Sequence, residues 1–148
     1  PHVDVVVSNV SVDGRRQKWW LHHVLSPLLL HFPTTLFACN FIGPTACLCF
    51  KKEQMQLFNP SLCWAVDYEW YYRMLQNSRV CYLRTNYIRS HHGHKGQISQ
   101  TIDIQMVMQS DNETLRKIYA SHLRIRLFIF IGKAIRKFLL ALHSKRTH

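Results

Sequence analysis

The sequence predicts an α/β fold in which a mixed short sheet with helices is followed by a C-terminal helical tail. Short β-branched stretches alternate with segments of helical spacing over residues 1–100, and no proline interrupts residues 101–148. Hydrophobic residues make up 47% of the 148 residues, which is typical of a globular chain and excludes a disordered one. The strands are too few for a complete doubly wound sheet with its own ligand crevice.

The first elements are predicted from turn residues. Residues 3–12 are rich in valine and precede an Asp-Gly pair, so we expect a hairpin whose second strand covers residues 15–20. Ser26-Pro27 resembles a helix start, because proline suits the first helical position, and residues 28–31 would continue this short helix.

The middle of the chain alternates between strand and helix patterns. A loop over residues 40–50 should end in an apolar strand, and a short helix is expected over residues 51–58. Apolar and aromatic spacing predicts a helix with one buried face over residues 64–76. Two strand-like pieces follow, at residues 80–83 and 87–89.

The positive charge of the chain is concentrated in its tail. The whole sequence has 19 Lys and Arg against 8 Asp and Glu, but residues 115–148 contain nine basic and no acidic residues. We expect residues 101–148 to form a basic amphipathic helical tail that can contact an anionic membrane or nucleic acid. At 100° per residue, one side of residues 123–142 carries Leu123, Leu127, Phe130, Ile131, Ala134, Phe138 and Leu142. A helix packed on the domain with a solvated basic face is the alternative.

The five cysteines show neither zinc-ribbon nor C-x-x-C spacing. Their apolar surroundings indicate free, buried thiols in a reducing compartment. No apolar run approaches the roughly 18 residues of a membrane-spanning helix. We therefore expect a cytoplasmic protein that lies peripherally at the inner face of the membrane.

Residues 40–46 (NFIGPTA), 58–75 (FNPSLCWAVDYEWYYRML) and 89–99 (RSHHGHKGQIS) resemble, in order, three blocks of glycosyltransferase family 2. Residues 4–15 (DVVVSNVSVDGR) also look like the strand pair after that family's metal-binding motif. The resemblance implies that residues 1–100 are the C-terminal, acceptor-side part of a GT-A (Rossmann-like) glycosyltransferase domain. It further implies an enzyme that transfers a sugar from a nucleotide-sugar donor to an acceptor hydroxyl with inversion. The acceptor would be a glycan or a lipid-linked molecule.

The resemblance places Asp67 at the position of the catalytic Asp, with Val66 where the family usually has Glu. A carboxylate there can take the proton of the acceptor hydroxyl as the hydroxyl attacks the anomeric carbon. An Asp at a helix start also suits an N-cap, and both roles can hold together. Arg73 lies four residues after Glu69, and the simplest interpretation is a structural ion pair.

The resemblance also implies residues that bind acceptor or donor, namely Gly43, Trp64, Trp70, His91 and His94. Two alignments compete for the late family His, one choosing His91 and the other His94, and either could neighbour a metal-bound diphosphate. Gly43 could equally be a plain turn before Pro44, and the histidines a solvated loop.

The family binds nucleotide and divalent metal (Mn or Mg) through a D-x-D motif, and no D-x-D occurs in this sequence. Asp111 and Glu113 have D-x-E spacing but are interpreted as a helix-start charge pair. We therefore expect a metal in the complete enzyme, none bound by this chain alone, and an inactive isolated chain. The alternatives are a non-enzymatic basic binding module, for membrane or nucleic acid, and a natural pseudo-enzyme. Nucleic acid is disfavoured, because the aromatic residues are not interleaved with the basic tail.

Overall fold

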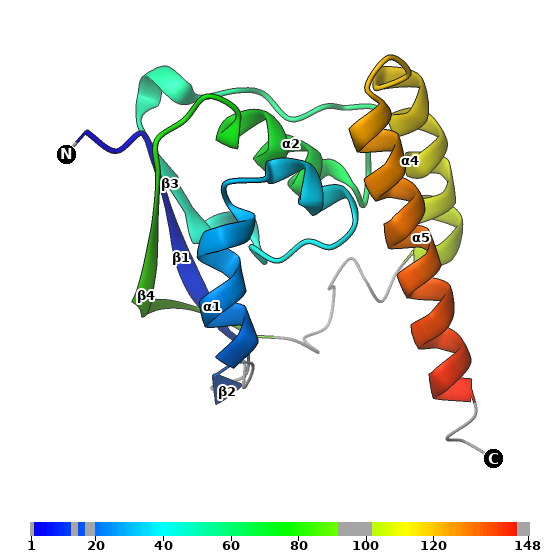
Figure 1. The fold of residues 1–148 in the computed structure, drawn as a ribbon, viewed down its shortest axis with the longest axis horizontal. Coiled ribbons are helices and arrows are strands. Elements are labelled where there is room, and N and C mark those ends of the chain that lie inside the picture. The colour runs from blue at the N-terminus through cyan, green and yellow to red at the C-terminus, as the bar shows by residue number, and fades with distance from the viewer. Residues whose placement is uncertain (1, 13–14, 17–19, 92–101, 145–148) are drawn as a thin grey trace.

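The computed structural model describes residues 2–12, 15–16, 20–91 and 102–144 (Figure 1). Within them lie a small mixed sheet and four α-helices, which are α1 (Trp20–Leu29), α2 (Val66–Leu75), α4 (Ile104–Ile118) and α5 (Leu123–Ser144). The predicted mixed α/β organisation is confirmed at this level. None of the helices in these ranges is long and apolar enough to cross a membrane.

Strand β1 (Val5–Val12) is the centre of the sheet. Strand β4 (Val80–Ser90) runs parallel to it along its whole length, while β3 (Leu48–Phe50) pairs antiparallel with its first residues. The two residues of β2 (Arg15–Arg16) pair antiparallel with its last residues. Because β4 occupies one edge of β1, the short strands β2 and β3 share the other edge.

Asp4 joins three segments at the start of the sheet. Its carboxylate accepts hydrogen bonds from Lys51 Nζ at 2.9 Å and from Arg79 Nε at 3.0 Å. The hydrogen bond from Arg79, and then that from Lys51, holds the pKa of Asp4 well below its ordinary range. The carboxylate therefore aligns the start of β1 with the end of β3 and the start of β4.

Several predicted boundaries were wrong. Of the predicted strand over residues 15–20, Arg15 and Arg16 form β2, residues 17–19 lie outside the described residues, and Trp20 is helical. Helix α1 begins at Trp20 instead of Ser26, so Pro27 lies inside the helix. Only two residues of α1 follow Pro27, which confines the loss of a backbone hydrogen bond to the last turn. The two strand pieces at residues 80–83 and 87–89 join into β4 across a register shift, where Leu83 pairs with Ser8 and Tyr87 with Asn9.

The predicted helix over residues 51–58 is reduced to the short 3-10 turn η3 (Lys52–Gln54). The segment then runs extended, because the carbonyl groups of Gln56 and Leu57 accept hydrogen bonds from α2. Trp70 Nε1 donates to Gln56 O at 2.7 Å, and Arg73 Nη2 donates to Leu57 O at 2.8 Å. These tertiary hydrogen bonds replace the helical ones.

Phe37 connects the sheet-forming part of the chain to the tail. It ends the 3-10 helix η1 (Pro33–Phe37), which packs against both α2 and α5. Its ring makes edge-on contacts with Tyr72 of α2, at a centroid distance of 5.0 Å, and with Tyr119, at 5.3 Å. Such aromatic pairs contribute about 0.5–1.5 kcal/mol beyond the area that they bury.

The helical tail predicted over residues 101–148 contains a turn between two helices, α4 and α5. Helix α4 ends at Ile118, and α5 starts at Leu123 after a turn that includes Tyr119. The Tyr119 side chain points back into the core, where its hydroxyl donates to Glu69. Burial of this aromatic side chain fixes the position of the turn.

Gly132 sets how closely α5 approaches η1. A Cβ atom built on Gly132 would lie 2.7 Å from Ala38 O and 2.9 Å from Phe37 O. Both neighbours are backbone atoms, which cannot move aside without displacing the segment. The helix and η1 thus pack backbone against backbone at this point.

We predict that Gly132→Leu destabilises the fold by about 1–3 kcal/mol, because the added side chain overpacks a backbone contact. The loss should outweigh the higher helix propensity of leucine. The free energy of unfolding in urea measures it, and Ala134→Leu, on an exposed position of the same helix, is the matched control. Equal stability of the two variants would contradict the close packing of α5 on η1.

Candidate functional site

The segment before α2 is held by a carboxylate from α4. Asp111 is buried, and its Oδ2 atom accepts hydrogen bonds from the backbone N–H groups of Trp64 and Ala65, each at 2.7 Å. The N–H group of Cys63 donates to both carboxylate oxygens at 3.2 Å. Asp111 thereby accepts from the N–H group of the N-cap residue Ala65 and from those of the two residues before it.

The prediction of a helix-start charge pair at Asp111 and Glu113 was therefore wrong. The N-cap of α4 is Asp103, whose side chain accepts hydrogen bonds from Gln105 and Met106. Asp111 lies in the middle of α4 on the buried face that continues to Leu115. A carboxylate in an apolar stripe at helical spacing was the sequence signal for a buried, paired acid.

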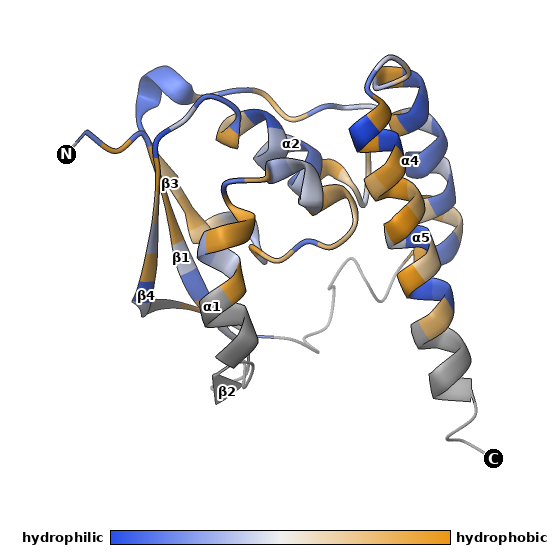
Figure 2. Ribbon diagram, viewed as in Figure 1, coloured by the Kyte–Doolittle hydropathy of each residue, from blue (hydrophilic) through white to orange (hydrophobic). Residues whose placement is uncertain are grey.

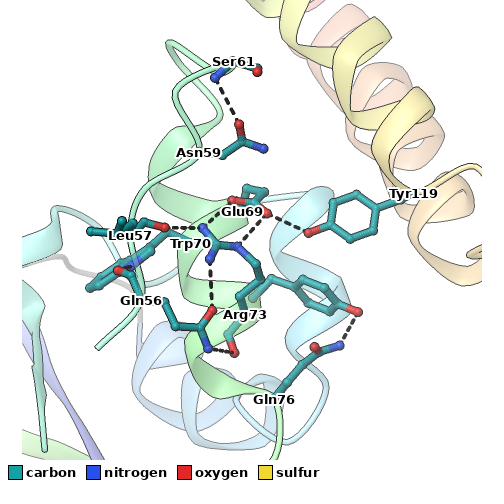
Figure 3. A network of polar contacts seen from close by, with 10 residues as sticks. Gln56, Leu57, Asn59, Ser61, Glu69, Trp70, Arg73, Gln76 and Tyr119 are labelled. Carbon is teal, nitrogen blue, oxygen red and sulfur yellow. Dashed lines mark hydrogen bonds and ion pairs between the residues drawn. The ribbon is translucent and has the colours of Figure 1, made fainter. Parts of the chain in front are cut away.

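A second buried carboxylate, Glu69, ties α2 to the tail (Figure 3). Its Oε1 atom accepts from Tyr119 Oη at 2.7 Å and from Arg73 Nε at 2.8 Å, and its Oε2 atom accepts from Arg73 Nη2 at 3.1 Å. The predicted ion pair between Glu69 and Arg73 is confirmed. Arg73 also donates to Gln56 Oε1 at 3.0 Å, so the pair extends to the segment before α2.

Asp67 is the second residue of α2, and Ala65 is the N-cap residue. Asp67 therefore does not cap the helix, and the interpretation as an N-cap was wrong. Its side chain is half-buried, and this burial raises the pKa of Asp67 above its ordinary value. A carboxylate with a raised pKa is a stronger base than an exposed one.

Tyr71, one helical turn after Asp67, contacts the loop that contains Gly43. The Tyr71 hydroxyl donates to Gly43 O at 2.9 Å. Burial, and then the negative charge of the nearby Asp67, raises the pKa of Tyr71 above its ordinary value. The Asn40 side chain shapes the same loop, because its Oδ1 atom accepts from the N–H groups of Ile42 and Gly43.

Gly43 has a backbone that only glycine adopts readily, with φ at 99°. A Cβ atom built there would lie 3.3 Å from Val10 Cγ1. The turn and the contact with Val10 account for this glycine without a ligand. Its role in binding remains a prediction.

A third predicted residue, His91, lies just beyond the carboxyl end of strand β4. His91 follows the last residue of β4, Ser90, which pairs with Val12 of β1. Gly43 contacts Val10, two residues before Val12. The loop of Gly43 and the position of His91 thus lie toward the carboxyl ends of the parallel strands β1 and β4.

The other predicted residues divide into two groups. Trp70 is buried in the core, where its indole N–H donates to Gln56 O, whereas Trp64 is half-buried just before α2. His94 lies outside the described residues.

In the ranges that the structure describes, no three His, Cys, Asp or Glu side chains converge. These residues do not fit a divalent-metal site by themselves, and we assign no step to a metal.

Two further features lie outside this region. A cavity of about 750 Å³ lies at the other end of α2, between α1 and the segment from Leu75 to Val80.

The five cysteines are unpaired, but Cys39, Cys49 and Cys63 are exposed, so the expectation that all five thiols are buried was wrong. Neither feature adds a group to the surroundings of Asp67.

Sequence reasoning did not identify Tyr71 or Tyr119. A tyrosine within a run of core residues carries a hydroxyl that needs a partner, and this was the available signal. The identity of each partner depends on chain folding. Gly43, the partner of Tyr71, is 28 residues away in sequence, and Glu69, the partner of Tyr119, is 50 residues away.

Comparisons with protein-family models, with curated proteins and with solved structures each found no match to this chain. Its function is therefore inferred from its own residues.

We predict that Asp111→Ala lowers the free energy of unfolding by at least about 2 kcal/mol, because it leaves buried backbone donors without an acceptor. Urea denaturation measures the change. Glu113→Ala, an exposed neighbour on the same helix, is the control and should be nearly neutral. A loss no larger than that of the control would show that other groups hold residues 63–65.

The raised pKa of Asp67 predicts how stability depends on pH. The folded state binds the proton of Asp67 more tightly than the unfolded state, so the stability of the protein should fall as the pH rises above about 4 through the folded pKa. Asp67→Asn removes this titration. The variant should gain stability relative to the parent protein between pH 4 and 7, by urea denaturation at several pH values. The opposite trend would mean that the ionised carboxylate has a stabilising partner.

Proposed function

We propose that this chain is the acceptor-side part of an inverting glycosyltransferase with a GT-A fold, and that Asp67 is its general base. The single observation that carries the proposal is the position of Asp67. This half-buried carboxylate with a raised pKa lies in the first turn of α2, one helical turn before Tyr71, whose hydroxyl donates to the loop that contains Gly43. The resemblance of residues 40–46, 58–75 and 89–99 to glycosyltransferase family 2 supports the same assignment.

In the proposed reaction, Asp67 accepts the proton of an acceptor hydroxyl. The hydroxyl oxygen forms a bond to the anomeric carbon of the donor sugar, and the bond from that carbon to the nucleoside diphosphate breaks with its electron pair. A single displacement of this kind inverts the anomeric centre and needs one base. General-base catalysis typically contributes about 10²–10⁴-fold to the rate.

The surroundings of Asp67 are suited to this role. The backbone before the helix is fixed by Asp111, and Tyr71 fixes the neighbouring loop at Gly43. A base held on a rigid element keeps the geometry that proton transfer needs. Binding of a divalent metal and the donor nucleotide would also need a D-x-D motif, which this sequence does not contain.

We predict that Asp67→Asn lowers transfer by about 10²–10⁴-fold in the natural protein that contains this chain. The assay measures release of nucleoside diphosphate from a panel of nucleotide sugars, with Mn²⁺ or Mg²⁺ and acceptor glycans or lipids present. Glu53→Gln changes an exposed carboxylate of the 3-10 turn η3 and should leave the rate unchanged.

Two results would contradict the proposal, one for the identity of the base and one for the reaction class. Full activity of Asp67→Asn would show that another group is the base. If the parent protein turns over none of the nucleotide sugars, the assignment as a glycosyltransferase is wrong.

A further inference from the structure

Helix α5 has two apolar faces, and the fold buries only one of them. Ile125, Ile129 and Gly132 are buried against the body of the protein. The exposed side instead carries Leu123, Leu127, Phe130 and Phe138, whose exposed fractions lie between 54% and 76%. At 100° per residue the centres of the two faces are about 170° apart.

In this arrangement, the apolar side of α5 that packs on the protein is not the side that the sequence pattern predicted. The sequence pattern placed Leu123, Leu127, Phe130 and Phe138 on one apolar side, and Ile129 was not part of that side. In the structure Ile129 belongs to the packed face, and the grouped residues face solvent. Figure 2 shows hydrophobic segments recurring along the visible side of α5, at the side of the molecule away from the sheet.

Basic residues border the exposed apolar face on both sides. Arg126, Lys133 and Lys137 are exposed and lie along one border, and Arg124 lies along the other. No acidic residue occurs anywhere in residues 115–148. An exposed stripe of leucine and phenylalanine with cationic borders complements a surface that is apolar inside and anionic at its boundary.

We propose that α5 binds an anionic lipid bilayer with this face, lying in the plane of the membrane interface. Leu123, Leu127, Phe130 and Phe138 would enter the boundary between headgroups and acyl chains, and the bordering cations would contact lipid phosphates and carboxylates. This inference does not depend on the proposed catalytic activity, because it uses none of the residues around Asp67.

Other occupants fit the surface less well. A second copy of the chain would bring the same rows of cations close to each other. A two-fold interface uses the same surface of both copies, so the like charges at its borders would repel. Nucleic acid would contact the cations but would leave the four large apolar side chains against a charged backbone. Protein interfaces are depleted in lysine, which borders this face.

The test is sedimentation of the whole chain with vesicles of phosphatidylcholine alone, or of phosphatidylcholine mixed with phosphatidylserine. We expect binding to the mixed vesicles only, with weakening at high salt. Leu127→Gln combined with Phe130→Gln should weaken binding by about tenfold or more. Leu57→Gln changes a side chain that is 80% exposed elsewhere and should bind like the parent chain.

A second variant separates charge from apolar insertion. Replacing Arg126, Lys133 and Lys137 by Gln should weaken binding to the mixed vesicles and remove most of its salt dependence. Circular dichroism checks that each variant is folded. The proposal is wrong if the parent chain binds neither kind of vesicle, or if the folded Leu127 and Phe130 variant binds as tightly as the parent. It is also wrong if that variant instead converts a dimer to a monomer in light scattering, which would identify a second copy as the occupant.

Discussion

The structure depends on the pairing of two carboxylates that are buried around helix α2. A carboxylate removed from water destabilises a fold by several kcal/mol unless hydrogen bonds and opposite charge replace its hydration. Asp111 of α4 meets this requirement with three backbone N–H groups before α2, and Glu69 of α2 meets it with Arg73 and Tyr119. Because Asp111 and Tyr119 come from the tail, the tail is an integral part of the domain and fixes the start of α2.

This pairing explains why Asp67 is held firmly although it makes no cap of its own. The backbone before α2 is anchored by Asp111, and the next loop is anchored to α2 through Tyr71 and Gly43. In sequence, Asp67 lies between residues 63–65 and Tyr71, and its partial burial disfavours its ionised form. A group that destabilises the fold while its neighbours stabilise it is typical of residues kept for chemistry.

The packing of the tail also leaves one apolar face of α5 exposed. The close contact of Gly132 with the backbone of η1 turns Ile125 and Ile129 inward and leaves Leu127 and Phe130 outward. The α4–α5 segment therefore connects the candidate site to the candidate membrane face through covalent and hydrogen-bonded links. A protein with an acceptor embedded in a bilayer would gain from this connection, because it orients the site relative to the membrane surface.

The sequence by itself determined the elements that local physics dictates. Valine-rich β1, the ion pair between Glu69 and Arg73, and the basic helix from Leu123 follow from β-branching, i,i+4 spacing and helical periodicity. Tertiary structure decided the rest. Residues 51–58 do not form the predicted helix, because Trp70 and Arg73 donate hydrogen bonds to the carbonyl groups of Gln56 and Leu57. A turn separates the two tail helices where the Tyr119 hydroxyl donates to Glu69. Asp67, Gly43 and His91 were chosen from the resemblance of their motifs. Only chain folding could bring Tyr71 to Gly43 or Asp111 to residues 63–65. Buried polar groups lose their hydrogen bonds to water, so they must pair with other buried groups, which can be distant in sequence.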